Sequence, residues 1–506
     1  MKYLLGIDIG TSATKTVLYD IYGKTVSYKA IEYPLYQERN GWAEQDPNDW
    51  WNAVVNGIRS VLADAKEGAS VIGVGLSGQM HGLVMLDKAG KSLRKSIIWC
   101  DQRTAQQCEK INTLIGNKRV IEITANAPMT GFTASKILWV MENEPDIYER
   151  CAHILLPKDY IRYMLTGEFA TEVSDASGMQ LMDVKNRCWS DEMLGKLGIN
   201  KALLGKMHES QEITGKTTKK AAKLTGLKEG VPVVGGAGDN PAAAIGTGII
   251  TEGAAFTTIG SSAVVYAVSD EPRIDMLSRV HTLCASVPGK WTVMSCTQAA
   301  GISLKWLKEV CCGEEVEKAQ SQRKSAYEIM DKLAGEIPPG AGKLLFLPYL
   351  MGERSPHPDP YCKGVFFGLS NAHTRAHLVR AVMEGVAFSQ RECVDVFREM
   401  GVPVSDMTVC GGGGRSPLWR QMLADLYGCP VKTLKADEGG ALGAAILAGV
   451  GVGEYKSLQE ACSLIVQKNE PIMPKKEASS LYEPYFKLYK KLYFDLKGDF
   501  TTLYKI

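Results

Sequence analysis

The sequence carries little net charge and no long hydrophobic segment. Its 58 Lys and Arg residues nearly balance 56 Asp and Glu residues, leaving a net charge of +2. So weak a field attracts neither nucleic acid nor an anionic membrane surface, and we expect neither as a partner. No run of about eighteen apolar residues occurs, and the N-terminal residues lack the apolar stretch and cleavage site of a signal peptide. We therefore expect no membrane span and no secretion.

The cysteines also lack the spacing expected of disulfides or of a metal site. The 13 cysteines are an odd number, and the close pair Cys311 and Cys312 has no histidine at zinc-ligand spacing. This pattern indicates reduced thiols rather than disulfides or a structural metal, as expected of a cytoplasmic protein. The motif Gly-x-x-x-x-Gly-Lys-[Ser/Thr] is absent as well, which excludes the Walker A class of nucleotide-binding loop.

What the sequence does contain is a repeated motif in a chain long enough for two domains. At 506 residues, the chain exceeds the size that one hydrophobic core usually supports. Ile-Gly-Thr-Ser-Ala at residues 9–13 returns as Ile-Gly-Ser-Ser-Ala at residues 259–263, each time followed by a β-rich run. A motif this short can recur by chance. If the repeat is real, it predicts a duplicated α/β domain with a cleft between the copies.

Each copy of the repeat predicts two strands joined by a turn of glycine and hydroxyl residues. The main-chain N–H groups and hydroxyls of such a turn can cradle phosphate oxygens. Asp8 precedes the first turn on an otherwise apolar strand, where a carboxylate is costly to bury without a cation or donor. Mg²⁺ would satisfy it; a turn-stabilising aspartate is the alternative. The turn residues are Gly10, Thr11 and Ser12 in the first copy and Gly260, Ser261 and Ser262 in the second.

Residues 231–248 lie at the seam between the two copies and predict a strand, a glycine-rich turn and a helix from Ala242. The turn lets main chain approach a ligand closely, and the N-terminus of the helix favours anions. Asp239 and Asn240 stand on this turn, where a carboxylate can face a cleft. The alternative is that one of them merely caps the helix, with Pro241 just inside it.

Polar side chains follow two predicted strands of the first half, at residues 71–76 and 97–99. Open α/β sheets bind ligands at the carboxyl ends of their strands. We therefore expect a hydroxyl-binding pocket with an aromatic face against carbon and charged groups against hydroxyls. Taken alone, His81 is as well explained as a hydrogen-bonded structural histidine. The side chains expected to line the pocket are His81, Trp99, Asp101, Arg103 and Asp239.

Four consecutive glycines, Gly411, Gly412, Gly413 and Gly414, follow a predicted strand and precede a helix. Bare main chain at a strand-to-helix turn lets the phosphates or adenosine of a nucleotide approach the helix N-terminus. A tight turn with Ser416 as its cap explains the Ser-Pro that follows but not four glycines.

Two helices are predicted between these motifs. Residues 314–333 predict one charged amphipathic helix with a solvated face. Residues 374–400 predict a second, long helix.

Two longer motifs resemble the signatures of a known family. The first is Gly-Phe-Thr-Ala-Ser-Lys-Ile-Leu-Trp-Val-Met-Glu-Asn at residues 131–143. The second is Gly-Val-Phe-Phe-Gly-Leu at residues 364–369, with His-Leu at 377–378 and Ala-Val-Met-Glu at 381–384. On these residues the chain resembles the FGGY carbohydrate kinases over nearly its whole length.

The resemblance implies an α/β fold of two ribonuclease H-like domains, of the actin and sugar-kinase superfamily, with a central cleft. We expect residues 1–247 to form a sugar-binding N-terminal domain and residues 248–506 a nucleotide-binding C-terminal domain. Asp239 matches the family's catalytic base, and Asp8 matches the acid that organises Mg²⁺. The four glycines match the adenosine-binding glycines. Ser261 stands where the family usually has Thr, and because the hydroxyl is kept we expect little change.

Residues 77–82, Ser-Gly-Gln-Met-His-Gly, resemble the xylulose-specific members of the family rather than the glycerol-specific ones. The resemblance implies Met80 and His81 as the sugar-binding pair, with Trp99, Asp239 and Asn240 beside them. The expected reaction transfers the γ-phosphoryl group of ATP to the 5-hydroxyl of D-xylulose. A kinase of ribulose, glycerol or gluconate, an ATPase of the same fold that acts on no sugar, and a sugar sensor without phosphoryl transfer are the alternatives. Family likeness alone makes a homodimer plausible.

Overall fold

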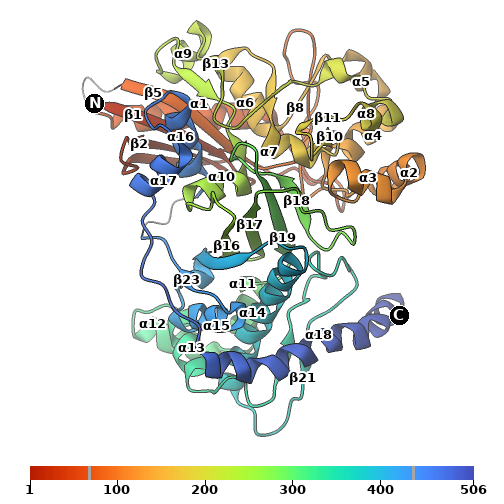
Figure 1. The fold of residues 1–506 in the computed structure, drawn as a ribbon, viewed down its shortest axis with the longest axis vertical. Helices are drawn as coiled ribbons and strands as arrows, with labels where there is room; N and C mark the ends of the chain where they lie inside the picture. The colour runs from red at the N-terminus through yellow and green to blue at the C-terminus, as the bar shows by residue number, and fades with distance from the viewer. Residues whose placement is uncertain (67–69, 436–438) are drawn as a thin grey trace.

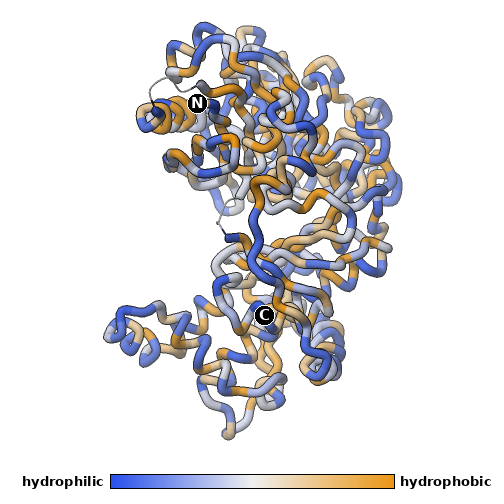
Figure 2. The backbone as a smooth tube through the Cα atoms, turned by 60° about the vertical axis from the view of Figure 1, so that its left-hand side comes forward, coloured by the Kyte–Doolittle hydropathy of each residue, from blue (hydrophilic) through white to orange (hydrophobic). Residues whose placement is uncertain are grey.

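The computed structural model describes residues 1–66, 70–435 and 439–506, which form two lobes around two mixed β-sheets (Figure 1). Figure 2 shows the lobes one above the other, with hydrophobic segments running through each of them. In the first sheet the order is β13-β14-β5-β1-β2-β3, with β15 beside β5. Its strands are β1 (Lys2–Ile9), β2 (Ala13–Asp20), β3 (Thr25–Glu32), β5 (Ser70–Gly78), β13 (Ile213–Lys216), β14 (Pro232–Val234) and β15 (Ala237–Gly238).

The second sheet repeats the topology of the first. Its order is β18-β19-β17-β16-β22-β23. In both sheets a hairpin of the first two strands pairs in parallel, through its first strand, with a later strand: β1 with β5, and β16 with β22. The repeated motif therefore marks a duplicated α/β unit, as the sequence predicts. The strands are β16 (Gly253–Ile259), β17 (Ala263–Ser269), β18 (His281–Cys284), β19 (Trp291–Thr297), β22 (Val404–Cys410) and β23 (Val431–Lys432).

Helix α1 (Pro47–Ala63) covers one part of the first sheet. It begins at Pro47 because the Asp46 carboxylate accepts a hydrogen bond from the main-chain N–H of Asn48. Trp50, Val54 and Ile58, spaced four residues apart, are all fully buried on the face that contacts β2 and β3. Helices α6 (Pro157–Thr166) and α9 (Lys219–Thr225) contact α1.

Helix α16 (Gly440–Gly451) comes from late in the chain but packs against the first sheet, on β1 and β5 (Figure 1). Its main chain approaches so closely that only glycine fits below it. A Cβ at Gly6 would lie 2.0 Å from the Ala441 carbonyl oxygen, and a Cβ at Gly75 would lie 1.8 Å from that of Ala444. The last part of the chain therefore completes the core of the first lobe.

In the second lobe the long helix α14 (Arg375–Glu399) packs against the sheet and against several neighbouring helices, as predicted for residues 374–400. The single helix predicted over residues 314–333 is wrong. Two helices occur there, because Arg323 has a left-handed φ of 52° and the Ser325 hydroxyl caps the second helix. The other helices of this lobe are α11 (Gly301–Cys311), α12 (Gly313–Ser321), α13 (Ala326–Gly335), α15 (Pro417–Tyr427) and α18 (Lys476–Lys505). Helix α17 (Leu458–Ile465) instead packs beside α16 on the first lobe (Figure 1).

The first lobe also carries an insertion of helices and short strands between β5 and β13. The elements of the insertion are α2 (Ala105–Ile115), α3 (Asn117–Thr124), α4 (Thr133–Asn143), α5 (Pro145–Arg150), α7 (Val173–Ala176), α8 (Asp191–Leu197), β6 (Val84–Leu86), β7 (Ser96–Ile97), β8 (His153–Leu155), β9 (Ala170–Glu172), β10 (Met182–Asp183), β11 (Cys188–Trp189) and β12 (Lys206–His208).

Throughout the described residues, no helix has both the length and the apolar composition needed to cross a membrane.

Candidate active site

Asp239 begins helix α10 (Asp239–Gly246), directly after β15. The helix starts three residues earlier than the predicted start at Ala242. The N-cap residue is Gly238, and no side chain caps this helix. The Asp239 carboxylate instead accepts hydrogen bonds from the main-chain N–H (2.7 Å) and side-chain amide (3.0 Å) of Asn240. The capping alternative is therefore wrong, and this partly exposed carboxylate remains accessible to a ligand.

A second carboxylate, Asp8, lies close enough to Asp239 to influence its ionisation. Burial, followed by the charge of Asp8, raises the pKa of Asp239 from 3.8 to about 7. Burial also raises the pKa of Asp8, although a hydrogen bond from the Ser77 hydroxyl (2.7 Å) and the charge of Lys15 oppose the change. Two neighbouring acids that both resist ionisation form a site that favours a bound cation.

The surroundings of Asp8 suit Mg²⁺. Its carboxylate faces the first turn of α16, where a Cβ on Gly440 would lie 3.2 Å from Oδ1. Within the described part of the chain, no three His, Cys, Asp or Glu side chains gather into a metal site. A cation here would therefore take most of its ligands from water and from the ligand's oxygens, which is the usual coordination of Mg²⁺ in phosphate sites.

The two predicted glycine-hydroxyl turns occur, one in each lobe; their binding of phosphate stays a prediction. In the first, the Gly10 N–H donates to the Ala13 carbonyl (3.1 Å); in the second, the Gly260 N–H donates to the Ser262 carbonyl (2.9 Å). The main-chain N–H groups of Thr11 and Ser12 have no hydrogen-bond partner among the described residues. These N–H groups are free to bind anionic oxygens.

Three side chains hold the first turn by hydrogen bonds, directly or through one another. The Gln45 amide donates to the Thr11 carbonyl (2.6 Å), and the Gln79 amide donates in turn to Gln45 Oε1 (2.7 Å). The Trp99 indole N–H donates to the Thr11 hydroxyl (2.9 Å). Trp99, predicted beside the sugar, is thus attached directly to the phosphate turn. Gln45 and Gln79 were not predicted, because a lone glutamine carries no local signal of its distant partner.

The glycine run forms a tight turn, η3 (Gly412–Arg415), between β22 and α15. Gly411 has a φ of 78°, and a Cβ at Gly413 would lie 2.5 Å from Ile259 Cγ2. These positions require glycine for the fold itself. A Cβ at Gly412, however, would meet no protein atom within 4 Å. This exposed position therefore leaves room for a ligand. The capping of α15 by Ser416 does not explain why position 412 is a glycine.

Of the residues predicted at the sugar, His81 and Asn240 are partly exposed, while Met80 is buried. The Met80 side chain belongs to an apolar cluster that includes Phe256 and Met294 of the second lobe. A Cβ on Gly238 would collide with it, at 2.7 Å from its Cγ. Met80 therefore packs between the turn that carries Asp239 and the second lobe. Its contact with a sugar stays a prediction.

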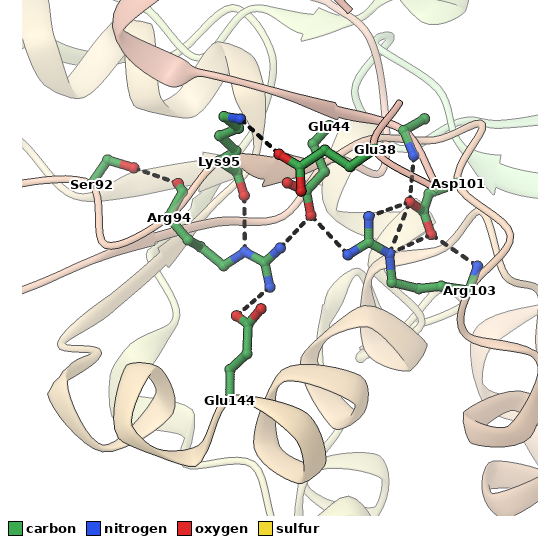
Figure 3. Close-up of polar contacts among 9 residues, drawn as sticks. Glu38, Glu44, Ser92, Arg94, Lys95, Asp101, Arg103 and Glu144 are labelled. Carbon is green, nitrogen blue, oxygen red and sulfur yellow. Dashed lines mark hydrogen bonds and ion pairs between the residues drawn. The ribbon is translucent and has the colours of Figure 1, made fainter. Parts of the chain in front are cut away.

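Asp101 and Arg103, also predicted in the pocket, do not line an open surface. Their side chains are 0% and 1% exposed and bind each other (2.7 Å), and Arg103 also donates to Glu44 (2.8 Å). Figure 3 shows this network extending through Arg94 to Glu144. Because every charged group here already has a partner and is largely buried, the network has a structural role and leaves no charged group free for a ligand.

Comparison with known proteins identifies the family to which this chain belongs. The N-terminal domain description of the FGGY family of carbohydrate kinases matches residues 3–246, and the C-terminal domain description matches residues 255–452. The chain belongs to the FGGY family of carbohydrate kinases. Xylulose kinase from Bacillus subtilis (strain 168) is 37% identical over 504 residues, 99% of each chain. Xylulose kinase from Escherichia coli (strain K12) is 37% identical over 490 residues, 97% of this chain and 98% of that one.

Solved structures of a xylulose kinase and a glycerol kinase share the fold of this protein. Xylulose kinase from Rhodospirillum rubrum superposes with a TM-score of 0.92 at 29% identity, covering 99% of this chain and 100% of that one. Glycerol kinase from Plasmodium falciparum, solved with ADP, has a TM-score of 0.88 at 23% identity over 97% of this chain and 98% of that one. The two-domain α/β fold of a sugar kinase is thereby confirmed.

One further residue of this FGGY kinase holds the turn that precedes Asp239. Ser174, on α7, accepts a hydrogen bond at its hydroxyl from the Gly238 N–H (3.2 Å), the residue before Asp239. The Glu172 carboxylate caps α7 by accepting hydrogen bonds from the N–H groups of Ser174 and Asp175. Nothing in the sequence around Ser174 indicates this role, because the contact joins residues 64 positions apart.

Proposed function

We propose that this protein is an ATP-dependent xylulose kinase, which transfers the γ-phosphoryl group of ATP to the 5-hydroxyl of D-xylulose. The observation that carries the proposal is the 37% identity to xylulose kinases along almost the entire chain. The segment Ser-Gly-Gln-Met-His-Gly at residues 77–82, which resembles xylulose-specific kinases, supports the same substrate. Phosphorylation of a sugar requires a base, a phosphate-binding surface and a sugar pocket, and the site offers a candidate for each.

Asp239 is the proposed general base. Its carboxylate would accept the proton of the attacking hydroxyl as the bond to phosphorus forms. Because the transition state of phosphoryl transfer is loose, the proton moves late, and an ordinary carboxylate suffices. A pKa of about 7 leaves Asp239 a stronger base than a solvated aspartate while still largely ionised at slightly alkaline pH.

The two glycine-hydroxyl turns are proposed to bind the phosphates from opposite lobes. The free N–H groups of Thr11 and Ser12 would hold phosphate oxygens in the first lobe, and Gly260, Ser261 and Ser262 would do so in the second. Mg²⁺ beside Asp8 would neutralise charge on the β- and γ-phosphates. Most of the acceleration then comes from positioning and charge neutralisation.

The remaining proposals concern the roles of the two domains, the location of the enzyme and its assembly. Residues 1–247 would bind the sugar through Met80, His81, Trp99 and Asn240, and residues 248–506 would bind the nucleotide through the glycine run. We propose a cytoplasmic enzyme, because all 13 cysteines are free thiols. A homodimer is proposed on family likeness alone.

A coupled assay of ADP release tests the proposal. The purified enzyme is given MgATP with D-xylulose, D-ribulose, gluconate or glycerol in turn. Gluconate belongs in the panel because a gluconate kinase from Lactobacillus acidophilus shares the fold with a TM-score of 0.92 at 25% identity. The highest kcat/KM is expected with D-xylulose. A higher value with another alcohol would reassign the substrate, and ADP release that no alcohol stimulates would reject the sugar-kinase proposal.

A further inference from the structure

Lys136 is a buried lysine in the first family signature, on α4, and no step of the proposed reaction uses it. Its side chain is fully buried. The ammonium nitrogen donates to two main-chain carbonyls, those of His81 (2.8 Å) and Gly131 (2.7 Å). No ion pair joins Lys136 to any residue in the described ranges. A lysine without a carboxylate partner is rarely buried, so the two carbonyl contacts require an explanation.

The residue that Lys136 holds has an unusual backbone. His81 has a left-handed φ of 69°, which few residues other than glycine adopt without support. Its carbonyl accepts hydrogen bonds from both the Lys136 ammonium and the Thr133 hydroxyl (3.1 Å). Both donors lie on α4, so this one helix holds the His81 main chain in a strained conformation.

The ring of His81 is fixed as well. Nδ1 lies 3.0 Å from the Gly178 carbonyl oxygen, and a carbonyl oxygen can only accept, so Nδ1 carries a proton. A Cβ at Gly178 would lie 2.4 Å from the ring, which shows how closely this contact is packed. The ring also packs beside Phe132, with the ring centroids 4.5 Å apart.

The charge state of the ring follows from its surroundings. Burial, followed by the positive charge of Lys136, lowers the pKa of His81 well below 6.5. Burial also lowers the pKa of Lys136 itself, to about 7. The imidazole is therefore neutral at physiological pH. With its proton on Nδ1, Nε2 carries a lone pair that can only accept a hydrogen bond.

We propose that Lys136 is a positioning residue that fixes His81 so that Nε2 accepts a hydrogen bond from a hydroxyl of the sugar. This inference rests on the proposed function, in which a ketose binds beside His81. It also predicts which chemical group of a substrate His81 selects. An acceptor favours an alcohol, which can donate, and rejects a carboxylate or keto oxygen, which cannot. The site thereby disfavours a sugar acid whose carboxylate would face His81.

Steady-state kinetics of Lys136→Met test the positioning role. Methionine keeps much of the length of the side chain but lacks the ammonium, so it makes neither the hydrogen bond to the His81 carbonyl nor the one to the Gly131 carbonyl. We expect the KM for the sugar to rise by about 10- to 100-fold, with the KM for ATP within about twofold of wild type. Thr133→Val, which removes the longer of the two hydrogen bonds to His81, should raise the sugar KM by a smaller factor. Lys118→Met, on the exposed surface of α3, is the matched control and should change neither constant.

Two results would overturn the proposal: an unchanged sugar KM in Lys136→Met, or an equal rise of both KM values. All variants are assayed with whichever alcohol the wild-type enzyme phosphorylates best, so a wrong substrate assignment does not imitate a failure of Lys136.

Nuclear magnetic resonance of the wild-type enzyme gives a test that needs neither turnover nor a folded Lys136 variant. Labelling with ¹⁵N-histidine produces signals from only 7 histidines, and a His81→Gln sample identifies the signal of interest. The expected signal is that of a neutral ring that stays protonated on Nδ1 throughout the range from pH 8 to pH 6. A ring protonated on Nε2, or one that titrates in this range, would refute the proposed acceptor.

Discussion

The change Asp239→Asn should abolish catalysis and at the same time stabilise the fold. Asparagine keeps the oxygen that accepts the two hydrogen bonds of Asn240, so the local geometry survives. It removes a negative charge that burial and Asp8 both disfavour. Loss of the base should reduce kcat by at least about 100-fold, while the KM for ATP stays near the wild-type value.

The gain in stability can be worked out from the pKa of Asp239. Folding raises this pKa from 3.8 to about 7, so between these values the folded enzyme holds a proton that the unfolded chain has released. The free energy of unfolding therefore falls as the pH rises from about 4 to about 7 and stays low above it. At about 1.4 kcal/mol per pKa unit the full effect is roughly 4 kcal/mol. Because Asp239 keeps some contact with solvent, we expect about 1–4 kcal/mol, or several degrees in Tm.

Thermal unfolding of the wild type and the variant at pH 8.5 and pH 5.0 measures this difference. The variant should unfold at the higher temperature at pH 8.5, and its advantage should shrink to less than half at pH 5.0, where the wild-type carboxyl is protonated. Asp499→Asn, the same change at an exposed position of α18, should have no effect at either pH. A variant that is no more stable at pH 8.5, or equally favoured at both pH values, would refute the assigned environment of Asp239.

Three further predictions address the residues proposed to bind Mg²⁺ and ATP. Asp8→Asn should lower kcat by about 100-fold and raise the Mg²⁺ concentration that gives half-maximal rate; an unaltered Mg²⁺ titration would remove Asp8 from the metal site. Gly412→Ala should raise the KM for ATP several-fold without lowering Tm, because the added Cβ meets no protein atom within 4 Å; an unchanged KM would exclude a nucleotide from this position. Trp99→Phe removes the donor to Thr11 and should raise the KM for ATP by about 3- to 10-fold, and a change confined to the sugar KM would show that this hydrogen bond is unimportant.

The parts of the site that the sequence predicts are those with a local signal. A glycine followed by hydroxyl residues between two β-rich runs predicts both phosphate turns. The glycines before Asp239 predict a strand-to-helix turn at the seam, although not the residue at which α10 begins. The duplicated topology follows from the repeated motif. Each of these signals spans fewer than about twenty residues, within which periodicity and turn preferences operate.

The parts that the sequence does not predict depend on distant partners. Asp101 and Arg103 follow a strand end, as ligand contacts do, but Glu44 neutralises Arg103 from 59 residues away. Lys136 lies within a helical motif, and only the fold brings its ammonium to the His81 carbonyl, 55 residues earlier. The break at Arg323 was missed because the charged periodicity of residues 314–333 continues across it. Propensity therefore predicts elements, while long-range packing decides which polar groups remain available to ligand.

The position of α16 has a consequence for how the enzyme is made. The strands of the first sheet leave the ribosome early, but the helix that covers Gly6 and Gly75 is translated only when the chain is nearly finished. Until then the growing polypeptide exposes an apolar sheet surface with no cover, which is prone to aggregation. Translation that stops before residue 440 should therefore yield insoluble product, and co-expressing residues 440–506 in trans should restore its solubility.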